Sequence, residues 1–146
     1  ASKMPGLDGQ KMSKSYNNTL ALREEPDAIE EKIRTMPTDP ARVRRTDPGD
    51  PMRCPVWGFH QVYSSEQLRS EIDAECRSAG IGCIDCKKHV IEAVQAELAP
   101  IRDRAAEFEK SPDLVRNIIH EGCEAAREEA RLTMEEVRDV MGLGPF

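Results

Sequence analysis

The stretch "DGQKMSKSYNN", residues 8–18, places two lysines three positions apart among small hydroxyl residues. Lysine supplies mobile positive charge, and serine hydroxyls and loop N–H groups supply hydrogen-bond donors. Such a loop suits a multiply charged phosphate chain, with charge-assisted hydrogen bonds of about 1.5–3 kcal/mol each. The order Gly-x4-Gly-Lys-Ser/Thr of a Walker P-loop is absent, so that mechanism does not apply. As bare chemistry, a solvated lysine loop is the simpler interpretation.

Cysteines form the second group of residues with chemical potential. Cys54 and Cys76 lie equally far from Ser65, where we expect the turn of a helical hairpin. Two antiparallel helices of matched length bring both thiols to the same end of that hairpin. The "CIDC" step, Cys83 and Cys86, follows directly after it. The spacing therefore predicts that four thiols converge on one point.

Spaced cysteines in a cytosolic chain indicate metal or redox chemistry before disulfides. Four thiolates suit either a tetrahedral Zn²⁺ ion or an iron–sulfur cluster, and spacing alone does not choose between them. The alternative is that Cys76 and Cys123 are ordinary buried cysteines. That alternative leaves the grouping of Cys54 with the "CIDC" step unexplained, so we favour a shared ligand.

These residues need helices to position them. Residues 1–50 are rich in turn signals, with one short helix that begins near Pro26 and buries Ile29, Ile33 and Met36. Beyond Pro51 apolar residues recur at helical spacing almost throughout. We expect an all-α fold, an antiparallel helical bundle preceded by a loop-rich segment.

Caps and breakers set the expected helix ends. Ser64 with Gln67 predicts a capping box, and Gly80 predicts the end of that helix. Gly82 and Gly80 should allow a tight turn before Cys83. Further along, Thr133 is expected to begin a separate last helix.

Composition limits the classes of function. The chain has 146 residues, 21 Lys and Arg against 27 Asp and Glu, and a formal net charge of −6. An acidic chain is a poor non-specific binder of nucleic acid, so any RNA contact must use local basic patches. No apolar run approaches the roughly 20 residues of a membrane span. The sequence predicts a soluble, cytoplasmic protein without membrane contact.

The string "KMSKS" within "PGLDGQKMSKSYNN" matches the signature of class I aminoacyl-tRNA synthetases. The stretches "CPVWGFHQVYS", "AGIGCIDCKK", "LAPIRDRAAEF" and "TMEEVRDVMGL" resemble the bacterial tryptophanyl-tRNA synthetase family almost end to end. The resemblance identifies the chain as the C-terminal portion of such an enzyme. Residues 1–50 would then be the KMSKS loop and connector of the catalytic domain, and residues 51–146 the helical domain that binds the tRNA(Trp) anticodon. The tyrosyl-tRNA synthetase and a stand-alone metal-binding helical module are the alternatives.

The family joins tryptophan to ATP as an adenylate and then transfers it to tRNA. The resemblance implies that the loop closes over ATP with Mg²⁺ and stabilises the leaving pyrophosphate, with Lys11 and Lys14 as the catalytic charges. The ATP-binding residues carried over by the motif are Lys11, Met12, Ser13, Lys14 and Ser15. The family's His-x-Gly-His-type stretch and tryptophan-binding residues are absent. We therefore expect the isolated chain to be inactive. The resemblance also implies that the full-length enzyme is a homodimer.

A subset of these bacterial enzymes carries a [4Fe–4S] cluster bound by four cysteines. The resemblance assigns this role to Cys54, Cys76, Cys83 and Cys86, with Zn²⁺ as the alternative; the first interval is one residue shorter than in the family's pattern. We expect the cluster to lock the hairpin to the long helix near an RNA-facing surface. The candidate RNA contacts are Arg42, Arg44, Arg45, Arg53, Lys87 and Lys88.

Overall fold

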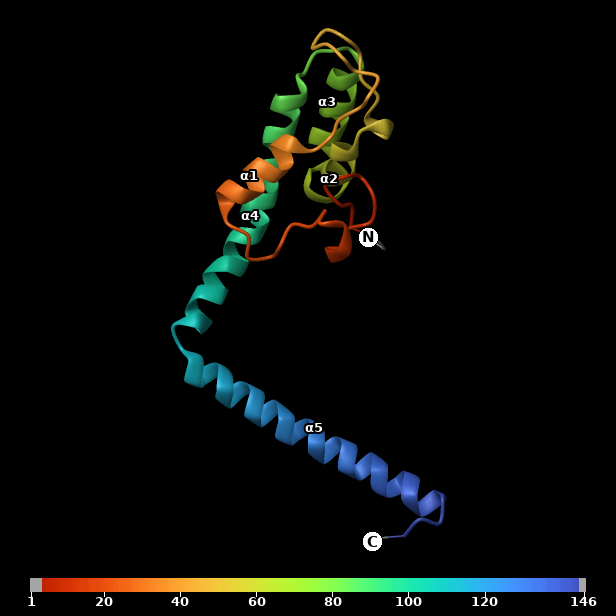
Figure 1. The fold of residues 1–146 in the computed structure, drawn as a ribbon, viewed down its shortest axis with the longest axis vertical. Helices are drawn as coiled ribbons and strands as arrows, with labels where there is room; N and C mark the ends of the chain where they lie inside the picture. Colours follow the sequence, from red (N-terminus) through yellow and green to blue (C-terminus); the bar gives the residue numbers. More distant parts are fainter. Residues whose placement is uncertain (1–3, 145–146) are drawn as a thin grey trace. The chain divides into compact units, whose positions relative to one another are not determined.

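The computed structural model describes residues 4–144, and the regular secondary structure of these residues is helical apart from one isolated β-bridge near their start. Its elements are η1 (Lys14–Tyr16), α1 (Pro26–Thr35), η2 (Pro51–Arg53), α2 (Pro55–Tyr63), α3 (Glu66–Arg77), α4 (Cys83–Glu109) and α5 (Pro112–Val140) (Figure 1). The predicted all-α fold is confirmed. The chain divides into two compact units, the first ending at Asp103 and the second beginning at Arg104. The division of the parent enzyme after residue 50 stays a prediction.

The core of the first unit is aliphatic and comes mainly from α1, α2 and α4. Ile29 and Ile33 of α1, Phe59 of α2, and Val90 and Val94 of α4 are all 0% exposed. Their spacing puts each set on one face of its helix, because residues three or four apart lie above one another. The loop-rich first third of the chain thus belongs to the same core as the helices that follow it.

Hydrogen bonds from α4 to backbone carbonyls fix α1 in place. The Lys87 ammonium donates to two carbonyls at the end of α1, at 2.7 and 2.6 Å. Gln95 donates to the carbonyl of Pro26, where α1 begins (2.9 Å), and Arg102 to that of Glu24 (3.3 Å). Since the partners run in opposite directions along the two helices, α1 lies antiparallel to α4.

Two predicted helix ends are wrong by a residue or two. The cap of α3 is Ser65, whose hydroxyl accepts from the Leu68 amide at 3.2 Å, whereas Ser64 ends α2. α3 stops at Arg77, and the left-handed position after it is Ala79, with φ of 59°, rather than Gly80. Serines adjacent in sequence offer the same capping chemistry, so composition could not distinguish them.

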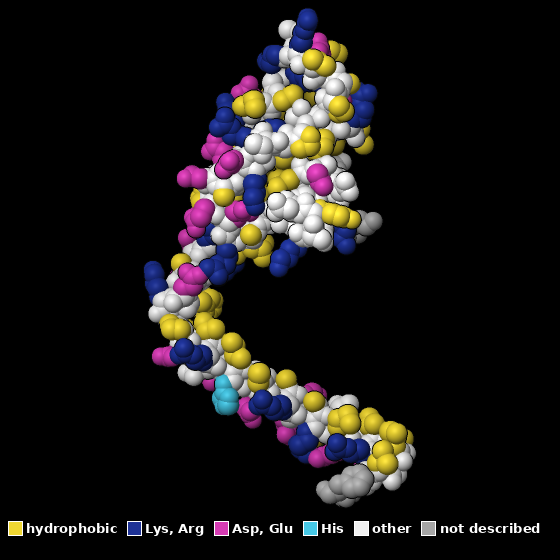
Figure 2. Space-filling view, in the orientation of Figure 1, with side chains coloured by type: hydrophobic (Ala, Val, Ile, Leu, Met, Phe, Trp, Pro, Cys, Tyr) yellow, Lys and Arg dark blue, Asp and Glu magenta, His cyan; other side chains and the backbone are white. Residues whose placement is uncertain are grey.

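The second unit consists mainly of α5, a single helix. The predicted new helix at Thr133 is wrong, because its hydroxyl donates within the helix to the carbonyl of Glu129 at 3.1 Å instead of capping an end. No residue of α5 is buried, and an apolar row that includes Leu114, Ile118 and Val137 is exposed along it (Figure 2). In residues 4–144 no helix has the length and apolar character needed to cross a bilayer.

Candidate phosphate loop and thiol centre

The lysine loop is held in a small hairpin at the start of the chain. Pro5 and Lys11 face each other in an antiparallel bridge. The Met12 amide donates to the carbonyl of Met4 at 2.9 Å, and the Gly6 amide donates across the turn at 2.6 Å. The backbone of Lys11 and Met12 is therefore paired, while the residues after them are carried on a turn of 3₁₀ helix.

A buried asparagine fastens this hairpin. Asn18 is 3% exposed, and its side-chain oxygen Oδ1 accepts from the Ser13 backbone amide at 2.7 Å. Its amide nitrogen donates to the Asp8 carboxylate (2.7 Å) and to the Lys11 carbonyl (3.2 Å). The bond from Asn18 is the main reason that the pKa of Asp8 lies below its ordinary value. A Cβ at Gly6 would lie 2.3 Å from the Asn18 amide nitrogen, so this close approach requires glycine.

The loop presents its charges outward. Lys11 and Lys14 are exposed, and neither pairs with an acidic group within the described part of the chain. The hydroxyls of Ser13 and Ser15 lie 3.1 Å apart. Met12, which lies between the two lysines in the sequence, packs against the core cluster. The hairpin thus offers two unpaired ammonium groups and two hydroxyls from an anchored backbone, a set of donors suited to phosphate oxygens.

All four predicted thiols line one cavity of about 20 Å³, space for about one water molecule. Cys54 is the N-cap of α2, Cys76 lies in the last turn of α3, and Cys83 and Cys86 lie in the first turn of α4. The hairpin geometry expected from the sequence therefore brings them together. A Cβ at Gly49 would lie 2.8 Å from the Cys76 sulfur, so the connecting loop also closes on this cavity.

As the side chains stand, no three His, Cys, Asp or Glu residues within 4–144 are grouped so that they could hold a metal ion. Burial, and after it the neighbouring thiolates, raise the pKa of Cys86 to about 12. The pKa values of Cys54 and Cys76 are also raised, again mainly by burial. Four buried anions would repel one another here, so deprotonation of all four requires a cationic partner in the cavity.

Two side chains already offer donors to the sulfurs. His60 is fully buried; its Nε2 lies 3.2 Å from the Cys86 sulfur and its Nδ1 lies 2.8 Å from the Ser64 hydroxyl. Arg42 lines the cavity and donates to the Ile81 carbonyl at 2.7 Å, while its Nε is buried without a hydrogen-bond partner. Burial is the larger cause that lowers the pKa of His60 to about 4, so this imidazole is neutral near pH 7. An unsatisfied guanidinium N–H beside clustered thiols fits an anionic centre.

The other basic residues predicted to contact RNA differ in whether their side chains are free to meet a partner. Lys87 is 4% exposed, with its ammonium bonded to the end of α1. Arg45 donates to the carbonyls of residues 79 and 80 at 2.7 and 2.9 Å, which fastens the turn after α3. Arg53 pairs with buried Asp39 at 3.1 Å. Arg44 is exposed, and Lys88 is exposed with a surface partner on its own helix. Among the candidates, Arg44 and Lys88 are the side chains most free to meet a partner.

Sequence reasoning missed three polar residues that organise these sites: Asn18, Asp39 and His60. Burial acts to raise the pKa of Asp39, but backbone N–H bonds from Asp50 and Ala41 and the Arg53 guanidinium outweigh it and lower that pKa. Nothing in the spacing of the three residues distinguished them from surface polar residues.

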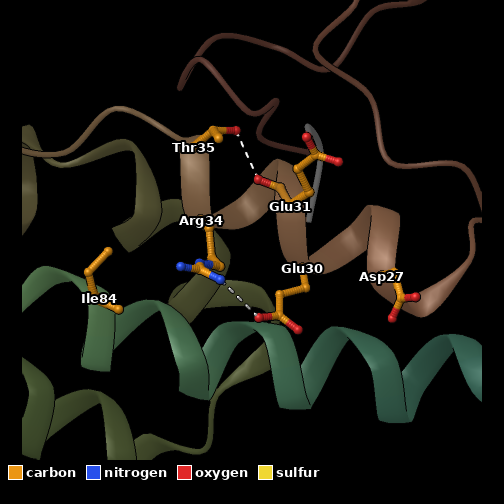
Figure 3. Close-up of a pocket in the computed structure, with 6 residues that line it drawn as sticks. All are labelled: Asp27, Glu30, Glu31, Arg34, Thr35 and Ile84. Carbon is orange, nitrogen blue, oxygen red and sulfur yellow. Dashed lines mark hydrogen bonds and ion pairs between the residues drawn. The ribbon is translucent and has the colours of Figure 1, made fainter.

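A surface hollow of about 480 Å³ lies elsewhere. It is lined by residues of α1 and by Ile84 of α4; the α1 residues include Asp27, Glu30 and Glu31, and Arg34 bonds to Glu30 (Figure 3). Its open, acidic lining contains none of the loop lysines or thiols. The predicted site residues therefore lie outside this hollow.

Comparison with known proteins identifies the class. Residues 2–99 match the family of class I tRNA synthetases for W and Y, and the chain belongs to that family. It is 57% identical over 143 residues to the tryptophan–tRNA ligase of Ralstonia nicotianae, covering 98% of this chain and 36% of that protein. The tryptophan–tRNA ligase of Thermotoga maritima is 46% identical, with 97% of this chain and 43% of that protein covered.

A solved structure gives the same result for the fold. The tryptophanyl-tRNA synthetase of Campylobacter jejuni, complexed with ADP and tryptophan, superposes with a TM-score of 0.83 at 26% identity. The match covers 97% of this chain and 44% of that one. The chain therefore spans less than half the length of the relatives it matches.

Proposed function

We propose that this chain is the C-terminal part of a tryptophan–tRNA ligase, in which the KMSKS loop stabilises pyrophosphate while tryptophanyl-adenylate forms. The observation that carries the proposal is the 57% identity to a tryptophan–tRNA ligase across nearly the whole chain. Tryptophan, ATP with Mg²⁺ and the remaining catalytic residues belong to the other part of the enzyme. The implied homodimer stays a prediction.

The loop geometry supports this role. Negative charge moves onto the pyrophosphate as the adenylate forms, and donors already aimed at that charge lower the barrier. Lys11 and Lys14 are exposed cations without acidic partners in the described residues, and Asn18 holds the backbone that carries them. Their anchored backbone lowers the cost of ordering the lysine side chains on a phosphate chain.

A chimeric ligase tests the assignment. This chain replaces the matching 143 residues of the Ralstonia nicotianae ligase, and tryptophan-dependent ATP–pyrophosphate exchange is measured. We expect exchange in the chimera and a loss of about 10²–10³-fold in Lys14→Ala, the range seen when one transition-state donor is removed. The isolated chain should show none. A chimera without tryptophan-dependent exchange, or one in which Lys14→Ala exchanges as fast as the unsubstituted chimera, would overturn the proposal.

For the thiol cavity we propose a [4Fe–4S] cluster bound by Cys54, Cys76, Cys83 and Cys86. Four sulfurs line one cavity, with a buried guanidinium N–H and an imidazole beside them, and this lining suits a thiolate-bound metal centre with net negative charge. The spacing of Cys76, Cys83 and Cys86 resembles the family's cluster motif, so we choose the cluster over a Zn²⁺ ion. Iron in such a cluster would supply the positive charge that keeps the four thiolates ionised. Through it, the cysteines would tie together the start of α2, the end of α3 and the start of α4.

For tRNA, we propose that the helices bind the anticodon region through exposed cations, with Arg44 and Lys88 as the principal contacts. Both are exposed, whereas Lys87 is buried and Arg45 is bonded to backbone carbonyls. Removing a phosphate contact should weaken tRNA binding and reduce its salt dependence by about one unit of log–log slope. Unchanged affinity and slope in the double variant Arg44→Met/Lys88→Met would contradict this assignment.

A further inference from the structure

The KMSKS hairpin and the thiol cavity share one support, the first turn of α2. A Cβ at Gly9 would lie 3.0 Å from Cβ of Pro55, so the hairpin turn rests directly on that proline. A Cβ at Gly58 would lie 3.1 Å from Cβ of Pro5, so the hairpin also rests on the next turn of the helix. Gly9 has φ of +81°, which favours glycine there on conformational grounds as well.

Each contact leads to a functional group in one step. Pro5 faces Lys11 across the β-bridge, so a shift of Pro5 moves the backbone of a pyrophosphate-binding lysine. On the other side, Pro55 directly follows Cys54, the N-cap of α2. The Trp57 amide, in the first turn of α2, donates to the Cys54 carbonyl at 3.0 Å and so ties Cys54 to the helix start. The position of the Cys54 sulfur is thereby linked to the orientation of the helix start.

We propose that Pro55 and Gly58 are positioning residues for the KMSKS loop, and that occupancy of the thiol centre fixes the loop through them. This inference rests on the proposed cluster and loop function. When the centre is filled, Cys54 would share its bound group with Cys76 at the end of α3 and with Cys83 and Cys86 at the start of α4. The start of α2 then loses freedom to tilt, and the surface beneath Pro5 and Gly9 becomes rigid.

Amide hydrogen exchange on the 146-residue chain tests the link without an activity assay. The chain is reconstituted with iron and sulfide in the absence of air, and exchange at Met12 is compared with that of the metal-free chain. The Met12 amide bonds to the Met4 carbonyl inside the hairpin, far from any thiol along the sequence. We expect loading to slow its exchange about tenfold or more, since opening of the hairpin becomes less favourable.

A wedge variant separates the link from cluster binding. Gly58→Leu should displace Pro5 and abolish the slowing of Met12 amide exchange on iron loading, while iron uptake is unchanged. The smaller change Gly58→Ala should reduce that slowing without abolishing it. Gly122→Leu is the matched control, because a Cβ at Gly122 meets nothing within 4 Å. Iron bound to the parent chain with no change at Met12 overturns the link alone.

If the chain takes up no iron, the cluster proposal is overturned instead. The positioning of the KMSKS hairpin by Gly58 is then tested on the metal-free chain. There, Gly58→Leu must speed Met12 exchange about tenfold while Gly122→Leu leaves it unchanged. Equal exchange in the two variants shows that Gly58 does not position the loop.

Discussion

Replacing Lys87 by methionine should destabilise the first unit although it deletes only a charge and keeps most of the side chain. Its ammonium satisfies the carbonyls of Arg34 and Met36, and the bond to Met36 is buried. An unpaired buried acceptor costs about 1–3 kcal/mol, and loss of a cation at a helix C-terminus costs about 0.3–1 kcal/mol more. Burial lowers the pKa of Lys87, so methionine is spared part of that desolvation cost. The expected net loss is about 2 kcal/mol.

The assay is urea unfolding followed by far-UV circular dichroism, with a thermal melt beside it. We expect a lower midpoint with an unchanged slope and a Tm about 4–8 °C lower, for a chain of this size. Lys88→Met is the control, because Lys88 is exposed and pairs only with Asp85 on its own helix. That variant should stay within about 0.5 kcal/mol of the parent. If Lys87→Met is no less stable than Lys88→Met, Lys87 does not fasten α1 to α4 as argued.

Three further outcomes are expected. Asn18→Ala should cost about 2–3 kcal/mol, since it leaves two hairpin backbone groups unpaired, and should speed amide exchange at Ser13; protection of Ser13 as in the parent contradicts the fastening role. Burial acts to raise the pKa of Glu24, but the ion pair with Lys32 and a backbone N–H bond outweigh it, so the pKa in the folded chain is lowered. The ionised Glu24 therefore contributes its full stabilisation at pH values above its pKa in the unfolded chain. That contribution is lost as pH falls through the lower pKa of the folded chain. Urea titrations near pH 7 and near pH 3 give the free energy of unfolding at each pH. Between the two, the parent should lose up to about 1 kcal/mol more of this free energy than Glu24→Gln, and equal losses refute the pairing with Lys32. Cys83→Ser should abolish iron uptake under anaerobic reconstitution while Cys123→Ser, on exposed α5, retains it; equal uptake argues against the cavity as the site.

The sequence predicted the thiol grouping because helical rise is regular. Cys54 and Cys76 sit at mirrored positions of a hairpin that turns at Ser65, and that symmetry survives errors of one residue in the helix ends. The KMSKS string likewise identified the loop without any structure. The short helix after Pro26 was predicted because its apolar residues follow one face.

Other features depend on partners distant in the sequence and could not be predicted. Lys87 resembles Lys88 in sequence, yet one faces the carbonyls of α1 and the other faces solvent. His60 is a buried neighbour of Cys86 only because α2 packs against α4. α5 continues through Thr133, whose hydroxyl donates to the carbonyl of Glu129 four residues earlier. A threonine hydroxyl can equally cap a helix start, so the sequence did not distinguish the two cases.

The attachment of α1 to α4 has a consequence for how this region tolerates substitution. Its long-range polar bonds, from Lys87, Gln95 and Arg102, all end on main-chain oxygens. Any amino acid that keeps α1 helical presents those same oxygens, so the outward side chains of this helix are free to diverge between orthologues. The three donor side chains on α4 cannot be replaced in this way. A saturation mutagenesis scan should therefore find that the outward positions of α1 tolerate many substitutions and the three donor positions of α4 tolerate few.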